Sequence, residues 1–145
     1  MKKILLFILP VILSAQDVKI GSWKNYLAYN SACYIAESEN NIYCIANGSL
    51  YYLNKSDESI SRMSKINGLS DVDLNKASYS SELNLLIITY NNCNIDVVSN
   101  NEIINISDIK RKEVAGLKEI NNIKLKDSVA YLSTTMGLIL VDLEK

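Results

Sequence analysis

The sequence predicts an all-β fold, because short apolar strands recur between turn-forming residues and no long helical stripe interrupts them. Stretches rich in Ile, Val, Leu, Tyr and Thr are separated by Asn, Ser, Asp and Gly from Ala32 to Leu143. No apolar pattern with helical spacing runs far enough for a substantial helix. The 145 residues, 48% of them hydrophobic, suffice for one domain with its own core.

The predicted strands fall into groups of four. The first group comprises Cys33–Glu37, Ile42–Ala46, Ser49–Asn54 and Ser59–Ser64. The second comprises Asn75–Ser80, Leu85–Tyr90, Asn94–Ser99 and Glu102–Ser107. The third has only three strands, at Ile120–Lys126, Ser128–Thr134 and Gly137–Asp142. A connector from Lys65 to Val72 follows the first group, and its Asn-Gly pair supplies turn chemistry.

The third strands of the three groups reveal an internal repeat. They begin near Leu50, Ile95 and Leu138, each about 45 residues after the one before. A period of about 40–50 residues with four strands per unit is typical of β-propeller blades. We therefore predict an incomplete β-propeller with about three blades, near residues 32–66, 72–108 and 119–145. Three stacked β-meanders in a sandwich remain the alternative.

The composition of individual strands fits blades. The second strand of each group is continuously apolar, as in Ile42–Ala46, Leu85–Ile88 and Val129–Leu132. Such strands need no polar alternation when neighbouring blades cover both of their faces. The fourth strands, Ser59–Ser64 and Glu102–Ser107, are more polar, as expected of an outer rim with one wet edge.

The N-terminus predicts export. Lys2 and Lys3 precede an apolar stretch from Ile4 to Leu13, and the small residues of Ser14-Ala15-Gln16 follow it. We expect a signal peptide at residues 1–16, a propeller domain at 17–145, and a location in the periplasm or on the outer cell surface. A membrane anchor is the alternative, but the stretch is about half the length that a spanning helix needs and Pro10 interrupts it.

Composition argues against catalysis, cofactors and nucleic acid. The chain has no histidine, which removes the usual base of Ser-His-Asp and Cys-His sites, and its three cysteines lack metal-ligand spacing. A net charge of −1 gives no electrostatic reason to bind nucleic acid. Several carboxylates lie in predicted turns, where they are usually solvated or cap backbone amides: Glu37, Glu39, Asp57, Glu58 and Asp127. We expect no catalytic residue, cofactor or metal site.

Three segments have a candidate binding role, each beside a structural explanation. The loop Asn67–Asp71 would lie on a propeller face, but Gly68 suits a turn, Leu69 can pack under a sheet, and the polar residues can bond nearby amides. Trp23, Tyr26 and Tyr29 resemble a sugar platform, although aromatic packing is the commoner use. The basic run Lys110–Lys112 is most simply a solvated loop.

One cysteine pair is a candidate disulfide. If residues Glu37 to Asn40 form the loop of an antiparallel hairpin, Cys33 and Cys44 face each other across the two strands. An oxidising compartment would permit the bond. Free cysteines are nevertheless common in buried strands, and a bond directly across strands requires close and well-aimed Cβ atoms.

Five motifs follow one another along the chain: Ile20–Trp23 with Tyr26–Tyr29, then Asn67–Asp71, Ile88–Asp96, Asn105–Arg111, and Ala130–Leu132 with Met136–Leu143. In this order they resemble the N-terminal propeller of PorZ-type proteins, components of the type IX secretion system of Bacteroidota. Tyr26, Ala28 and Cys93 depart from this pattern, where histidine, proline and a turn glycine are usual.

The resemblance implies a larger protein with two seven-bladed propellers, of which this chain would be a truncated part ending within the third blade. It also implies a non-catalytic binding platform in a cell-surface attachment complex. In that complex a sortase-like peptidase moves secreted cargo onto anionic lipopolysaccharide. The expected partners of this chain are the attachment-complex proteins, including the peptidase, and the lipopolysaccharide. Two other functions stay open: the sensor propeller of a two-component regulator, and a secreted propeller that binds or cleaves glycans.

Overall fold

The structure is a computed structural model that describes residues 30–100 and 102–144, and these residues form three antiparallel sheets. The first sheet contains β1 (Ala32–Glu37), β2 (Asn41–Ala46), β3 (Ser49–Asn54) and β4 (Ile60–Met63). The second contains β5 (Leu74–Ser80), β6 (Leu85–Tyr90), β7 (Ile95–Ser99) and β8 (Glu102–Ile106). The third contains β9 (Ile120–Lys126), β10 (Val129–Thr134) and β11 (Gly137–Asp142). Two short helices, η1 (Lys65–Asn67) and α1 (Asp108–Arg111), lie in the connectors.

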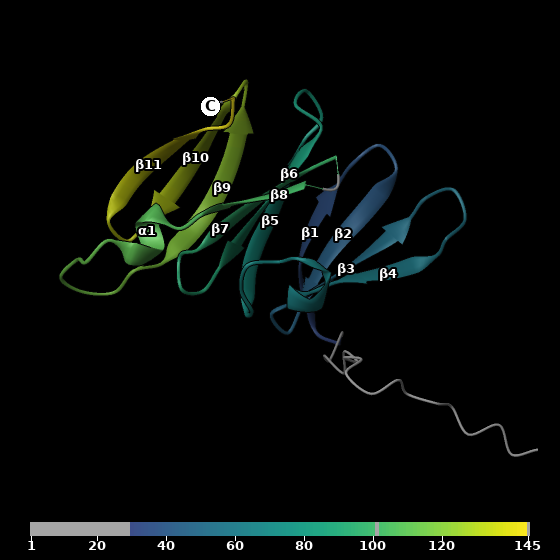
Figure 1. Cartoon of the computed structure of the whole chain (residues 1–145), viewed down its shortest axis with the longest axis horizontal. Coiled ribbons are helices and arrows are strands. Elements are labelled where there is room, and N and C mark those ends of the chain that lie inside the picture. The colour runs from purple at the N-terminus through teal and green to yellow at the C-terminus, as the bar shows by residue number, and fades with distance from the viewer. Residues whose placement is uncertain (1–29, 101, 145) are drawn as a thin grey trace, which may run out of the picture.

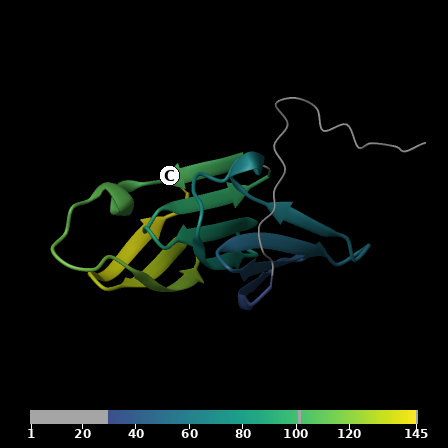
Figure 2. The same ribbon diagram turned by 90° about the horizontal axis from the view of Figure 1, so that it is seen from below.

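The sheets are arranged as successive blades of a partial β-propeller. Within each sheet the strands are neighbours in chain order, which is the meander expected of a blade. The first strands of the sheets contact one another, β1 with β5 and β5 with β9, whereas β4 and β8 lie at the outer ends of their sheets. The sheets fan out around these first strands and face one another (Figures 1 and 2). The predicted fold class is confirmed.

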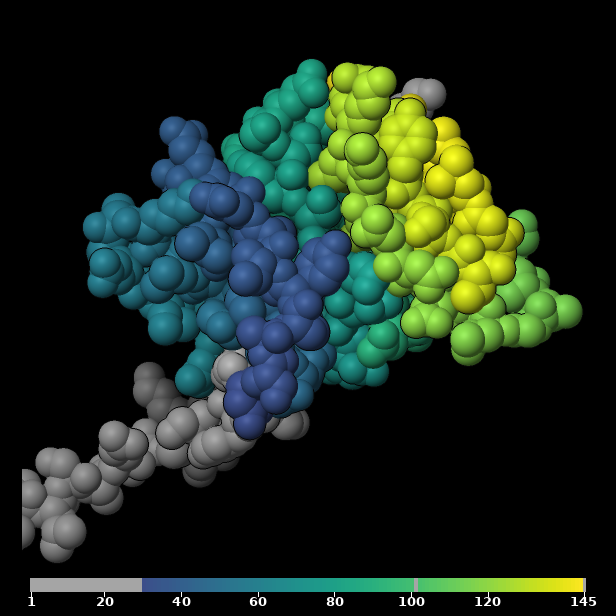
Figure 3. All heavy atoms as spheres, turned by 180° about the vertical axis from the view of Figure 1, so that it is seen from behind, coloured from purple at the N-terminus to yellow at the C-terminus, as the bar shows by residue number. Residues whose placement is uncertain are grey.

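Each interface between neighbouring sheets has its own apolar core. The first core, which includes Ile45, Leu50 and Ile88, lies between the first and second sheets. The second, which includes Ile87 and Leu132, lies between the second and third. The space-filling view shows the three sheets in direct contact (Figure 3). All six residues of β6 are buried because both of its faces are covered, as predicted for a second strand.

The other two second strands are less buried. The exposure of β10 alternates along the strand, because only one face of the third sheet is covered within the described residues. In β2 the last three residues are buried and the first three are partly exposed. The prediction of burial on both faces therefore holds fully for the middle sheet.

The turn between the second and third strands of a sheet touches the next sheet. In the first sheet, Asn47 and Gly48 have positive φ values of 47° and 67°, which is typical of a two-residue hairpin turn. The Gly48 carbonyl accepts a hydrogen bond of 2.9 Å from the amide of Leu74, at the start of β5. In the second sheet Cys93 occupies the corresponding turn with φ 63°, and burial raises the pKa of its thiol. The bond at Gly48 thus joins the first sheet to the second.

The structure contradicts the register behind the proposed Cys33–Cys44 disulfide. Cys44 lies opposite Ile35, and Cys33 lies at an irregularity between Ala32 and Tyr34. The hairpin loop is displaced by one residue from the predicted one, because Glu37 pairs with Ile42 in the ladder. All three cysteines are free, with Cys33 exposed and the other two buried. The expectation that Cys33 and Cys44 face each other is wrong.

Candidate functional site

The loop Asn67–Asp71 connects the first two sheets and packs closely against the second. Gly68 ends η1 in a left-handed conformation with φ 106°, which favours glycine. Leu69 is only 2% exposed and belongs to the first apolar core. These observations agree with the structural explanation for this loop.

A fully buried carboxylate, Asp96 on β7, holds the connector loop to the sheet. It accepts hydrogen bonds from the amide of Ser70 at 2.8 Å, the hydroxyl of Tyr90 at 2.5 Å and the amide side chain of Asn105 at 2.8 Å. Burial and the bond to Asp96 raise the pKa of Tyr90, so this hydroxyl remains a donor. The three donors compensate for the removal of this carboxyl group from water.

A second carboxylate, Asp71, joins two connectors. It accepts hydrogen bonds of 2.6 Å from both Lys110 of α1 and Asn92 in the β6–β7 turn, and one of 3.0 Å from the amide of Val72. Burial raises the pKa of Asp71, but the bonds from Lys110, Asn92 and Val72 outweigh this effect and lower it to about 2. The basic run is thus not simply a solvated loop, because Lys110 is paired.

We call Asp71, Tyr90, Asn92, Asp96 and Asn105 the connector cluster. Its carboxylates bond to donors from two connectors and two strands of the same chain. Oxygen atoms engaged in this way are poorly placed to take a proton from a substrate. The cluster therefore has a structural role, because it joins the connectors to each other and to the second sheet. The sequence analysis did not predict it. The sequence contains one indication of such a cluster, which is the aspartate within the apolar run Ile-Asp-Val-Val of β7. A charged group in a buried strand requires hydrogen-bonding partners.

Two of the carboxylates predicted to lie in turns have partners from their own chain, although Glu37 lies at the end of β1 and not in a turn. Glu37 forms an ion pair of 2.6 Å with Lys55, whose hydrogen bond lowers the carboxyl pKa. Asp57 accepts a hydrogen bond from the amide of Ser59, which lowers its pKa. Among the described residues, no three His, Cys, Asp or Glu side chains gather closely enough to hold a metal ion.

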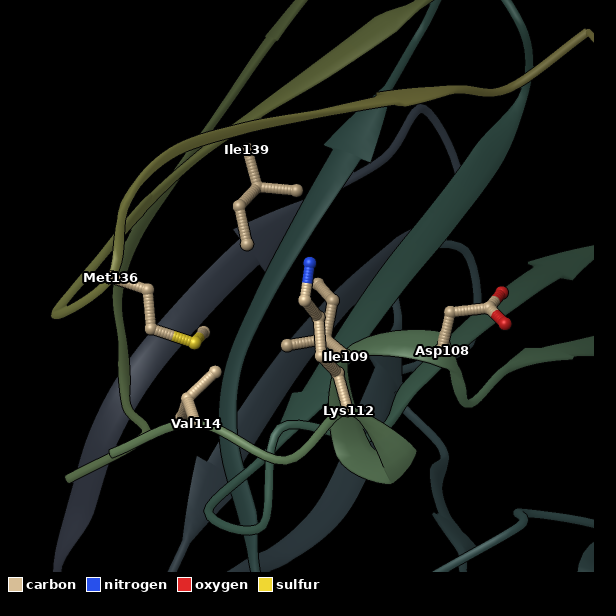
Figure 4. A pocket seen from close by; sticks show the side chains of 6 residues that line it. All are labelled: Asp108, Ile109, Lys112, Val114, Met136 and Ile139. Atoms are coloured by element: carbon tan, nitrogen blue, oxygen red, sulfur yellow. The ribbon is translucent and has the colours of Figure 1, made fainter. Parts of the chain in front are cut away.

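A groove of about 450 Å³ lies between the connector that follows β8 and the β10–β11 hairpin. In Figure 4 the side chains of Met136 and Ile139 on the hairpin side point toward Ile109 and Val114 on the connector side. Lys112 extends into the same space, whereas Asp108 points away from it. The groove is mainly apolar and open to solvent, which suits an aliphatic side chain better than a polar metabolite.

Two predictions fall on residues that the structure does not describe. These are the signal peptide at residues 1–16 and the aromatic segment containing Trp23, Tyr26 and Tyr29. Within residues 30–100 and 102–144, none of the helices has the length and apolar character needed to cross a bilayer.

Comparison with known proteins gives a consistent result. A family model for the N-terminal β-propeller domain of PorZ, of the type IX secretion system, matches residues 42–145. The fold also matches a solved structure of PorZ, described as an essential bacterial surface component of the type-IX secretion system of human oral-microbiomic Porphyromonas gingivalis. The TM-score is 0.78 at 28% sequence identity. No protein with a curated description matches significantly.

This chain is much shorter than the PorZ chain that it matches. The match covers 81% of this chain but only 16% of the PorZ chain. The family model and the structural match agree on the same domain, and the family model spans more than half of the chain. The chain therefore belongs to the family of the PorZ N-terminal β-propeller domain of the type IX secretion system.

Proposed function

We propose that this chain acts in the periplasm or at the outer cell surface as a non-catalytic binding platform of the type IX secretion attachment complex. The observation that carries the proposal is the family match over residues 42–145, joined to the structural similarity to PorZ. In this role the propeller binds other attachment-complex proteins, including a sortase-like peptidase that transfers cargo onto anionic lipopolysaccharide. The propeller positions these partners, and the peptidase performs the chemistry.

The chemistry of the chain supports a binding role. The whole sequence lacks histidine, and the buried carboxylate Asp96 accepts three hydrogen bonds from its own chain. The stacked sheets and the bonded connectors form a rigid scaffold whose loops lie at the ends of the sheets. Loops on a rigid β-scaffold are the usual place for protein recognition.

Deletion of the encoding gene from its native genome tests the proposal. Cargo proteins of the secretion system should then lose their attachment to the cell surface, and fractionation with immunoblotting would locate them in the periplasm or the medium. Restoring the gene should restore attachment. The protein recovered from the envelope should begin at Gln16 or Asp17, and recovery of intact Met1 there would contradict export by cleavage.

A destabilised variant, Asp96→Ala, compared at a matched protein level, should restore attachment less well than the unchanged chain, because attachment would require the folded propeller. Unchanged cargo attachment in the deletion strain would refute the proposed role. A loss of transcriptional response to an external signal, with attachment intact, would favour a sensor propeller. A loss of growth on a glycan would favour a glycan-binding one.

A further inference from the structure

A polar hollow of about 210 Å³ lies between the first two sheets, at the end where β1 turns into β2 and β5 turns into β6. These turns are on the upper side of Figure 1. The residues that line the hollow lie between positions 38 and 100, and both sheets that form it have four paired strands. The hollow therefore does not depend on the edge of the third sheet. We call it the amide hollow, because four asparagines line it: Asn40, Asn41, Asn84 and Asn100.

Two tyrosines give the amide hollow an aromatic surface. Tyr43 lies two residues after Asn41 in β2, so both side chains lie on the same face of the sheet. Tyr43 and Tyr79 of β5 both pack against the first apolar core, and their rings stack with centroids 6.5 Å apart and planes inclined by 24°. Leu86 lines the hollow and belongs to the same core. The hollow thus combines stacked rings with amide side chains at the end of an apolar core.

Asn41 has a buried amide end without a partner. Its Nδ2 lies 3.5 Å from the Tyr43 hydroxyl, and its buried Oδ1 has no hydrogen-bond partner among the described residues. Turning the amide over exchanges the two atoms and leaves the same end without a partner. Such a group lowers stability. Positive φ values of 50° and 48° explain asparagine at Asn84 and Asn100, but Asn41 lies in a strand, where asparagine is disfavoured.

The amide hollow offers neutral hydrogen-bonding groups. Among the described residues, the side chains that line it are all uncharged. The Tyr79 hydroxyl donates a hydrogen bond of 2.5 Å to Asn84. Burial, Tyr43 and the exposed carboxylate of Glu39 raise the pKa of Tyr79, so the hydroxyl stays protonated. Because a carboxylate acts on this hydroxyl, an anionic ligand is disfavoured. The hollow therefore suits an uncharged ligand that both donates and accepts hydrogen bonds.

We propose that the amide hollow binds one ring of a neutral sugar. The C–H face of the ring packs on Tyr43 and Tyr79, and a hydroxyl group bonds to the unpartnered amide end of Asn41. The volume is below the roughly 300–1,000 Å³ typical of sites for drug-sized ligands, which fits a single ring. The inference goes beyond the proposed secretion role and does not depend on it, since the lipopolysaccharide expected there is anionic.

A glycan microarray supplies the probes. It carries neutral oligosaccharides of glucose, galactose, mannose and N-acetylglucosamine, together with sulfated and sialylated forms of the same glycans. We expect the full chain to bind a subset of the neutral glycans without preferring their charged forms. Tyr79→Leu keeps an apolar side chain but removes the ring, and it should weaken binding of the best neutral glycan roughly tenfold. The control Tyr131→Leu, in the third sheet, should leave the affinity unchanged.

A second comparison separates a ligand role of Asn41 from a structural one. Asn41→Leu should abolish sugar binding and leave the urea midpoint unchanged or raise it, because it removes an unsatisfied polar group. Asn54 lies directly opposite Asn41 and is the matched control. Its Oδ1 accepts hydrogen bonds from the amide and the hydroxyl of Ser56. Asn54→Leu should therefore lower the midpoint and leave the sugar affinity unchanged.

The microarray is repeated with tagged protein purified from its native envelope, which contains any further part of the polypeptide. We expect the same neutral glycans to bind. Loss of binding there would mean that the polypeptide itself fills the hollow, and it would overturn the proposal. So would binding of charged glycans alone, binding that is insensitive to Tyr79→Leu, or no binding at all. A fall in the midpoint of Asn41→Leu equal to that of Asn54→Leu would make Asn41 a structural residue, with the same consequence.

Discussion

Replacement of Asp96 by alanine tests whether the connector cluster holds the first two blades in place. The carboxylate is fully buried and accepts hydrogen bonds from Ser70, Tyr90 and Asn105. Removing it leaves the buried hydroxyl of Tyr90 without this acceptor, together with two less buried donors, the amide of Ser70 and the side chain of Asn105. A hydrogen bond to a charged group contributes about 1.5–3 kcal/mol, and an unsatisfied buried group costs about 1–3 kcal/mol.

These contributions are not additive, and we expect Asp96→Ala to lower the free energy of unfolding by about 3–5 kcal/mol. Urea unfolding followed by far-ultraviolet circular dichroism would measure the loss. For a protein of this size it corresponds to a fall in the urea midpoint of roughly 2 M. Asp96→Asn keeps the shape and should cost less, because Asn105 can turn its amide to offer oxygen instead of nitrogen.

A double-mutant cycle with Tyr90→Phe separates the hydrogen bond from simple packing. In the native background the loss of the hydroxyl should cost about 1 kcal/mol or more. In the Asp96→Ala background it should cost little, because the hydroxyl has already lost its acceptor. If the losses of unfolding free energy in the two single variants add up, to within about 0.5 kcal/mol, to the loss in the double variant, the residues are not coupled. That result would refute the account of the cluster.

Further predictions follow from the cysteines, the second carboxylate and one turn. Thiol titration of unreduced, denatured protein should find three free thiols, with only Cys33 reacting rapidly in the native state; a single free thiol would mean that a disulfide forms. The pKa of Asp71 is lowered from 3.8 to about 2 by folding. Its contribution to stability is therefore present above pH 4 and lost as pH falls toward 2. Asp71→Asn should flatten this part of an acid-unfolding profile, and an unchanged profile would refute the assignment. Gly48→Ala should cost about 1–3 kcal/mol in a thermal or urea melt, because its Cβ would lie 2.6 Å from the Asp73 carboxylate at a positive φ; a neutral change would contradict this.

The blade pattern was predictable from the sequence because it depends on local signals. Apolar runs such as Leu85–Ile88 and turn residues such as Asn47-Gly48 mark strands and hairpins wherever they occur. The repeat of about 45 residues then indicated how the strands group into sheets. Strand bounds in the structure differ from the predicted ones mainly at the ends, where pairing fades.

The register of the first hairpin was not predictable, because it depends on details that composition does not encode. An irregularity between Ala32 and Tyr34 and the pairing of Glu37 with Ile42 move Cys44 opposite Ile35. A change of register alters every cross-strand neighbour, so the predicted cysteine contact was lost.

The connector cluster was also missed, for a different reason. Its contacts join residues that are distant in sequence, such as Ser70 with Asp96 and Asp71 with Lys110. The sequence shows an aspartate in an apolar strand but not which donors reach it. The same holds for the groove, whose walls come from a connector and a hairpin.

The most direct test of the proposed role is capture of the chain from its native envelope. An affinity tag would be placed on the chain, and an unrelated exported protein with the same tag would serve as the control. After mild crosslinking, mass spectrometry should find the sortase-like peptidase and other attachment-complex proteins enriched with the chain alone. Recovery of the intact chain from the envelope without enrichment of the peptidase would contradict the account.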